Sequence, residues 1–183
     1  MSKTTDGSPV RYPGIMATYY IKQKVLSLLG HFTIKNDTGA DCYVVDGKWS
    51  MMGDLRLTSM NEVELAQIKG KFSLRPTYEI YQDGTLAATV RQEFSFLKTK
   101  LAVEGPNWEI TGNWMSSQFD ITDMDGGVHA HISRELWTWG DSYRIDIAPG
   151  EPEVLLLCIV LVIDAVLAAQ RTAASAATTA SIH

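Results

Sequence analysis

The amino-acid sequence predicts an all-β protein with one helix. The expected fold is a closed antiparallel barrel of twelve strands that encloses a hydrophobic helix at the carboxyl end of the chain. Three observations lead to this prediction. One long apolar run stands near the end of the chain, short alternating runs fill the rest, and these runs recur with a period of about 22 residues.

The apolar run covers residues 154–171, VLLLCIVLVIDAVLAAQR, and its first ten residues are all apolar. This length exceeds that of one buried strand and predicts a helix, roughly 27 Å long. Pro152 with an acid on each side suits the helix start, and Arg171 suits its end. Since the helix is apolar on every side, an apolar wall must surround it. We expect these residues in the core: Leu156, Leu157, Ile159, Val160, Ile163 and Asp164.

A membrane-spanning helix is the alternative interpretation of this run. Such a helix needs about 20 apolar residues, and a charge near its centre is costly. The stretch before Gln170 has 16 residues and contains Asp164. The sequence therefore favours a helix enclosed by protein. We expect Asp164 to meet a hydrogen-bond donor on the surrounding wall or to reach water.

Composition limits the class of protein and its location. The chain has 183 residues, 45% of them hydrophobic and 20% charged, which is typical of one folded domain. The first 14 residues lack the apolar core of a signal peptide, and Cys42 and Cys158 cannot form a disulfide framework. We expect a cytoplasmic protein, peripheral at the membrane. A net charge of −5 argues against general nucleic-acid binding.

The rest of the chain consists of short runs of alternating residues rich in β-branched and aromatic side chains, with polar turns between them. This pattern predicts strands. In chain order the runs are TYYIKQKVL, HFTIK, CYVV, LRLT, ELAQIKGKF, TYEIY, LAATV, KLAVE, NWEIT, QFDIT, VHAHI and YRIDI.

These strands form a repeat that is marked by a hydroxyl residue. Successive steps in the first four repeats are 23, 23 and 22 residues, and the marking residues are Ser27, Ser50, Ser73, Ser95, Ser116 and Thr138. Each repeat supplies two strands, and in the sixth repeat the helix replaces the second one. One opening strand brings the total to twelve. A barrel of this size has room for an object about 10 Å across, which is the width of one helix.

Three segments of the chain resemble the LURP-one-related family. They are SMMGDLRLTSMNEVELAQIKGKFSLRPTYEIYQDG, WTWGDSYRIDI and the helix segment ending in VLVID. The family belongs to a tubby-like group that includes the Tubby carboxyl-terminal domain and the phospholipid scramblases. The resemblance implies a twelve-stranded barrel around a central helix. From the residues that lie outside this pattern we expect a flexible leader at 1–16 and a disordered or frayed tail at 172–183, which leaves one barrel domain at 17–171.

The resemblance says little about the function of this protein. Tubby domains bind phosphoinositides through basic surface residues, whereas this sequence lacks the Tubby motif. No phosphoinositide-binding residue therefore transfers to it.

The repeat brings charges of opposite sign to the two ends of the barrel. The repeat starts form what we call the basic rim, whose expected lipid-binding residues are Lys24, Lys48, Lys71, Arg75, Lys98, Trp49, Trp137 and Trp139, beside Phe72, Phe94 and Phe96. The inner turns form the acidic rim, with Asp37, Asp41, Glu62, Asp83, Glu104, Asp123, Asp125, Glu151 and Glu153. Basic residues beside tryptophans suit an anionic lipid surface. Alternatively, the aromatic residues close the barrel end and the lysines only keep it soluble, because acids such as Asp46 and Glu93 dilute this rim.

One cluster could bind a transition metal: Asp120, Asp123, Asp125, His129 and His131. A hairpin with Asp125, Gly126 and Gly127 in its turn explains the same residues and is the favoured interpretation. No catalytic arrangement, cofactor motif or metal site is otherwise predicted, so we do not expect an enzyme.

We expect a non-enzymatic binding module whose partner is an anionic phospholipid or phosphoinositide membrane surface, or an unidentified protein. A scramblase-type protein whose helix inserts in the membrane and a metal-dependent hydrolase are the alternatives.

Overall fold

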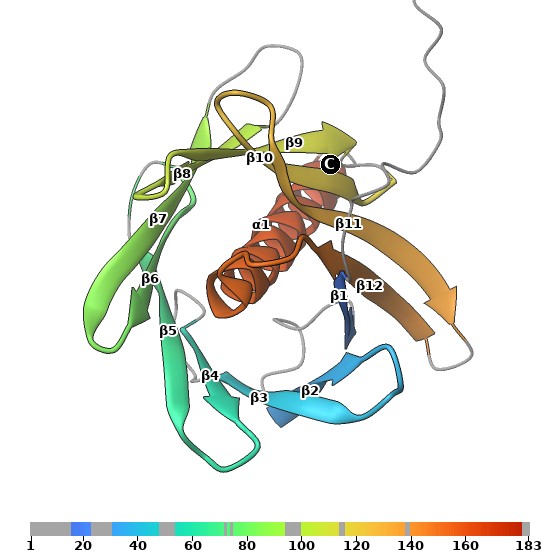
Figure 1. Cartoon of the computed structure of the whole chain (residues 1–183). Helices are drawn as coiled ribbons and strands as arrows, with labels where there is room; N and C mark the ends of the chain where they lie inside the picture. Colours follow the sequence, from blue (N-terminus) through green and yellow to red (C-terminus); the bar gives the residue numbers. More distant parts are fainter. Residues whose placement is uncertain are drawn as a thin grey trace, which may run out of the picture.

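Twelve strands and one helix make up the structure, a computed structural model that describes residues 16–22, 31–47, 54–71, 73, 75–93, 100–113, 116–137 and 140–180. The strands follow one another around a closed antiparallel barrel, and β1 pairs with β12 to close it. The helix α1 (Glu153–Ala180) runs through the middle of the barrel (Figure 1). The predicted fold class is confirmed.

The strands are short, as their alternating sequences predicted. In order they are β1 (Ala17–Lys22), β2 (His31–Asn36), β3 (Asp41–Gly47), β4 (Leu55–Ser59), β5 (Glu64–Lys71), β6 (Thr77–Gln82), β7 (Thr85–Glu93), β8 (Lys100–Glu104), β9 (Trp108–Asn113), β10 (Gln118–Asp123), β11 (Val128–Trp137) and β12 (Gly140–Ile147).

Alternate residues of each strand face the helix and form one continuous core with it. Ile34, Ile80 and Ile110 are fully buried examples. The helix backbone lies nearest to β5, β6 and β7. There, β5 and β7 carry Ala66 and Ala88 at buried positions, and small side chains allow the helix to approach the wall closely.

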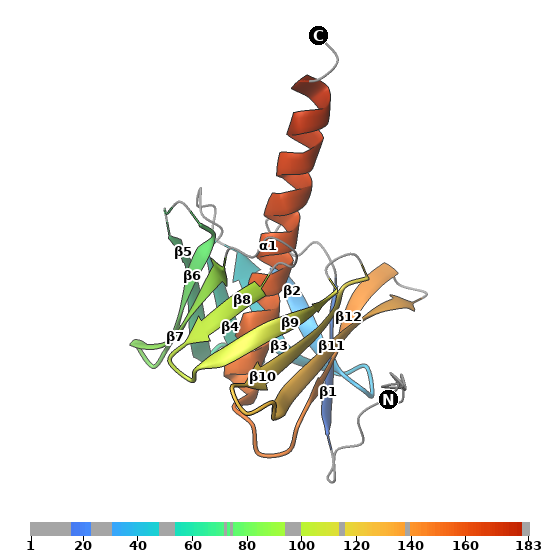
Figure 2. The same ribbon diagram turned by 90° about the horizontal axis from the view of Figure 1, so that it is seen from above.

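The first half of α1 is the buried part. The six residues expected in the core are each at most 1% exposed. Beyond Leu167 the helix leaves the barrel and continues to Ala180, as Figure 2 shows. The predicted helix end at Arg171 was therefore nine residues too early. Alanine has the highest helix propensity of all residues, which explains why the alanine-rich sequence after Arg171 continues the helix.

Two tyrosines fix the start of the helix. The Tyr43 hydroxyl on β3 donates a hydrogen bond to Glu153, and the Tyr19 ring on β1 lies 6.0 Å from the Tyr43 ring. Burial raises the pKa of both phenols, and the hydrogen bond to Glu153 raises each further. Both tyrosines therefore stay neutral donors toward a carboxylate in the first helical turn. An acid there is also stabilised by the helix dipole.

A second polar contact lies deep in the core. Asp164 is 1% exposed, and the Tyr143 hydroxyl on β12 donates to its Oδ1 over 3.4 Å. Tyr143 is itself 1% exposed. The expectation that Asp164 meets a donor on the barrel wall is confirmed. A buried carboxylate without such donors would cost several kcal/mol.

The enclosure of the helix predicts how the core responds to charge. We expect Leu157→Asp to give insoluble protein, because an unpaired buried carboxylate costs several kcal/mol and typical domains have only about 5–15 kcal/mol of stability. Soluble expression and urea unfolding check this. A variant with wild-type stability would place the helix outside the barrel.

The contact between Tyr143 and Asp164 predicts a specific loss of stability. Tyr143→Phe removes one donor from a buried carboxylate and should lower the free energy of unfolding by about 1–3 kcal/mol. Tyr78→Phe is the matched control, since Tyr78 is partly buried against the same core. It should cost less than Tyr143→Phe, and equal losses in urea unfolding would show that the hydroxyl of Tyr143 is not important.

Candidate binding surfaces at the two ends of the barrel

The two ends of the barrel differ in charge. All residues of the acidic rim lie at the end where α1 begins, in the hairpin turns and strand ends there. The helix leaves through the opposite end, which is the basic rim (Figure 2). This separation follows from antiparallel order, because alternate connections lie at opposite ends.

Some carboxylates of the acidic rim are compensated. Asp41 accepts hydrogen bonds from Lys35 at 2.5 Å and from Thr33 at 2.7 Å, and these contacts lower its pKa. Glu104 pairs with Arg91 at 3.0 Å.

Other carboxylates of this rim are not compensated. Four exposed side chains have no ion-pair or hydrogen-bond partner among the described residues, namely Asp37, Glu62, Asp83 and Asp125. This end therefore carries uncompensated negative charge.

The basic rim is described only in part. Lys71 ends β5, and its Nζ lies 2.7 Å from Oε2 of Glu79, a contact that raises the pKa of Lys71 and lowers that of Glu79. Arg75 is exposed in the connection that follows β5, and the backbone of Trp137 ends β11 at the same end of the barrel. The remaining predicted residues of this rim lie outside the described residues, namely Lys24, Lys48, Lys98, Trp49, Trp139, Phe72, Phe94 and Phe96.

The two histidines of β11 have different acidic neighbours: Asp120 lies beside His131, whereas Glu151 and Asp123 lie beside His129. Nδ1 of His131 lies 2.6 Å from Oδ1 of Asp120. His129 stacks on Trp108 with ring centroids 4.3 Å apart, and its Nδ1 lies 2.8 Å from Oε2 of Glu151 without the angle of a hydrogen bond. Within the described ranges, no three His, Cys, Asp or Glu side chains converge as metal ligands would.

The hairpin interpretation of this region explains the role of Asp123. Oδ1 of Asp123 accepts backbone hydrogen bonds from Asp125 at 2.9 Å and Gly127 at 2.7 Å. The backbone N–H of Asp123 also donates to the carbonyl of Gly127 over 2.9 Å. Asp123 therefore organises the turn, as such residues commonly do.

The pair formed by His131 and Asp120 predicts a pH dependence. The hydrogen bond to Asp120 raises the pKa of His131 above its usual value of about 6.5. The stabilisation is then complete below pH of about 6.5 and is lost as the pH rises through the raised pKa of the folded state. Because the pair is about half exposed, its contribution should stay below about 1 kcal/mol.

His131→Gln measures this effect. The variant should be less stable than the wild type at pH of about 6 and equal to it well above the raised pKa. An NMR titration of the His131 ring with a midpoint at or below the ordinary value would contradict the prediction.

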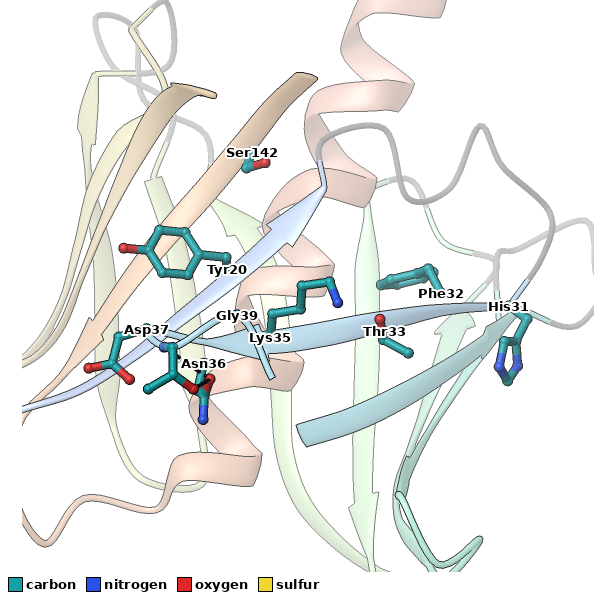
Figure 3. A pocket seen from close by; sticks show the side chains of 10 residues that line it. Tyr20, His31, Phe32, Thr33, Lys35, Asn36, Asp37, Gly39 and Ser142 are labelled. Carbon is teal, nitrogen blue, oxygen red and sulfur yellow. Dashed lines mark hydrogen bonds between the residues drawn. The ribbon is translucent and has the colours of Figure 1, made fainter. Parts of the chain in front are cut away.

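A groove that the sequence did not indicate lies on the outer wall beside β1 and β2 (Figure 3). The two strands pair at only two positions, Tyr19 with Asn36 and Tyr20 with Lys35, whereas β1 pairs with β12 along its full length. The groove has a volume of about 470 Å³, and its lining includes Tyr20, Phe32 and Lys35. Strand periodicity shows where strands occur but not where pairing between neighbours stops, so this feature had no signal in the sequence.

The charges beside this groove are only partly paired. Lys35 is paired with Asp41, and Nδ1 of His31 lies 2.8 Å from Oδ1 of Asp46. Asp37 also lines the groove and has no side-chain partner among the described residues, so the groove carries negative charge at its turn end.

The closed antiparallel barrel that encloses its own carboxyl-terminal helix is the tubby-like fold. A sequence profile of the LURP-one-related proteins matches residues 17–164. The chain belongs to the LURP-one-related family.

Two individual proteins are similar to the chain. It is 33% identical over 154 residues to the uncharacterized protein YxjI of Bacillus subtilis (strain 168), covering 83% of this chain and 94% of YxjI. The X-ray structure of the Arabidopsis thaliana protein AT5G01750 superposes with a TM-score of 0.63 at 14% identity, covering 82% of this chain and 91% of that one. This second likeness concerns the fold alone.

Proposed function

We propose that the protein is a non-enzymatic, cytoplasmic binding module that contacts an anionic phospholipid surface with its basic rim. The observation that carries this proposal is the gathering of uncompensated carboxylates at the opposite end. An anionic surface repels the acidic rim, so the molecule would approach such a surface with the end through which the helix leaves.

Residues of the basic rim supply the expected attraction. Lys71 and Arg75 lie there, and the sequence adds Lys24, Lys48 and Lys98 with neighbouring tryptophans. Each lysine or arginine near an anionic leaflet contributes about 1 kcal/mol. Glu79 partly neutralises Lys71, so this lysine contributes its full charge only if the pair separates at the surface.

The helix gives some support to the alternative function. In that alternative the protein is of scramblase type and inserts its helix in the membrane. Its segment Glu153–Gln170 has 18 residues and a mean hydropathy of 2.3, which by length and composition would allow it to cross a membrane. However, 72% of this segment is buried inside the barrel, and a core helix has the same composition. Insertion would expose the inner faces of the strands and remove Asp164 from Tyr143, so peripheral contact is the better proposal.

Liposome binding tests the proposed surface. Replacing both Lys48 and Lys71 by glutamate should weaken binding to anionic vesicles by about 2 kcal/mol or more, near thirtyfold, and the wild-type binding should weaken strongly with salt. The matched control reverses Asp83 and Asp125 to lysine at the other end and should change binding far less. Co-sedimentation with anionic and with neutral vesicles measures both variants.

Wild-type protein that ignores anionic vesicles at low salt would overturn the membrane proposal. A protein partner at the same rim would then take its place. Equal effects of the two double variants would show that net charge, not the basic rim, governs binding.

A further inference from the structure

The acidic rim also carries exposed apolar side chains. Among the described residues, the exposed large hydrophobic side chains are Met60, Val63, Leu86 and Met124. They are 49–63% exposed, and each lies in or beside a hairpin turn at the end where α1 begins. Single exposed apolar residues are ordinary, but several of them on neighbouring turns form a surface that a partner can cover.

Three of these four residues lie on two neighbouring hairpins. Met60 and Val63 belong to the β4–β5 hairpin, and Leu86 belongs to the β6–β7 hairpin. The two hairpins are adjacent because β5 pairs with β6 (Figure 1). A groove of about 160 Å³ lies between β5 and the β6–β7 turn, and Tyr81 in its lining is the strand partner of Leu86.

The charge around this groove is negative at its turn end. Asp83 lines the groove and is exposed, with no side-chain partner among the described residues, and Glu62 on the neighbouring turn has the same properties. Glu64 also lines the groove but is engaged by Arg56 at 2.9 Å. At the other end of the groove, Nζ of Lys69 lies over the Tyr81 ring, 4.7 Å from its centroid. The negative charge of the groove is therefore confined to its turn end.

We propose that this groove docks a cationic amphipathic segment of a partner protein. Lysine or arginine side chains of the segment pair with Asp83 and Glu62, and its apolar side chains contact Met60, Val63 and Leu86. Charge complementarity selects this occupant, because the groove would repel an anionic lipid surface. The proposal uses the opposite end from the lipid contact and does not depend on it.

Defined peptides test the proposal with the full-length chain. The probe is a fluorescent 18-residue helix of leucine and lysine with one apolar face, and its twin has glutamate in place of every lysine. Fluorescence anisotropy should show binding of the lysine peptide and none of the glutamate twin. Replacing Val63 and Leu86 by serine should weaken binding at least tenfold.

Charge removal is tested at the same site. Glu62 and Asp83 have left-handed backbone, with φ of 63° and 49°, and asparagine tolerates this conformation well. Glu62→Asn with Asp83→Asn should therefore fold normally, weaken binding several-fold and flatten its salt dependence. The matched control is Met124→Ser with Asp125→Asn on the distant β10–β11 hairpin, which should bind within twofold of the wild type.

Several results would overturn the proposal. They are failure of the lysine peptide to bind at micromolar concentration, equal binding of its glutamate twin, or an equal loss in the control variant. Thermal melting identifies any variant that fails to fold. If the serine variant does not fold, the binding measured for the asparagine variant tests the proposal instead. Sedimentation velocity that shows self-association abolished by the same substitutions would assign the groove to a second copy instead.

Discussion

The structure depends on one constraint, which is that a helix apolar on every side must be enclosed. Neither a single sheet nor a layer of helices covers such a surface completely, whereas a closed barrel does. The inner faces of all twelve strands and residues 155–167 of α1 form one core. Strand number and helix diameter then fit each other, because a smaller barrel is filled by its own side chains and a larger one leaves a channel.

The polarity of the barrel agrees with the direction of the helix. The positive end of the helix dipole lies at the acidic rim, where Glu153 accepts a hydrogen bond from Tyr43 in the first turn. The electrostatics of the helix and of the surrounding turns therefore favour the same orientation. This arrangement gathers negative charge at one end of the molecule, on which both proposed contacts depend.

Sequence reasoning reached the architecture because each part of it has a local signal. Alternation marks the strands, the repeat gives their number, and the apolar run marks the helix. The sequence indicates that Asp164 needs a hydrogen-bond donor. It does not identify Tyr143 as that donor, because the position of β12 against the helix depends on packing across the barrel. The pairing of Lys71 with Glu79 was missed for a similar reason, because it follows from the register of β5 against β6. The short pairing of β1 with β2 and the groove beside it had no local signal at all.

The pairing of β1 with β12 has a consequence for how the chain folds. Tyr20 is the partner of Arg144, so the contact that closes the barrel joins strands from opposite ends of the domain. During synthesis the edge of β1 stays unpaired until β12 has been made, and the helix that fills the core follows β12 in the chain. Closure of such a distant contact is slow, and open strand edges invite pairing with other chains in the meantime. The protein should therefore be most prone to aggregation while it is still attached to the ribosome, and truncation before the helix should leave it without a soluble folded state.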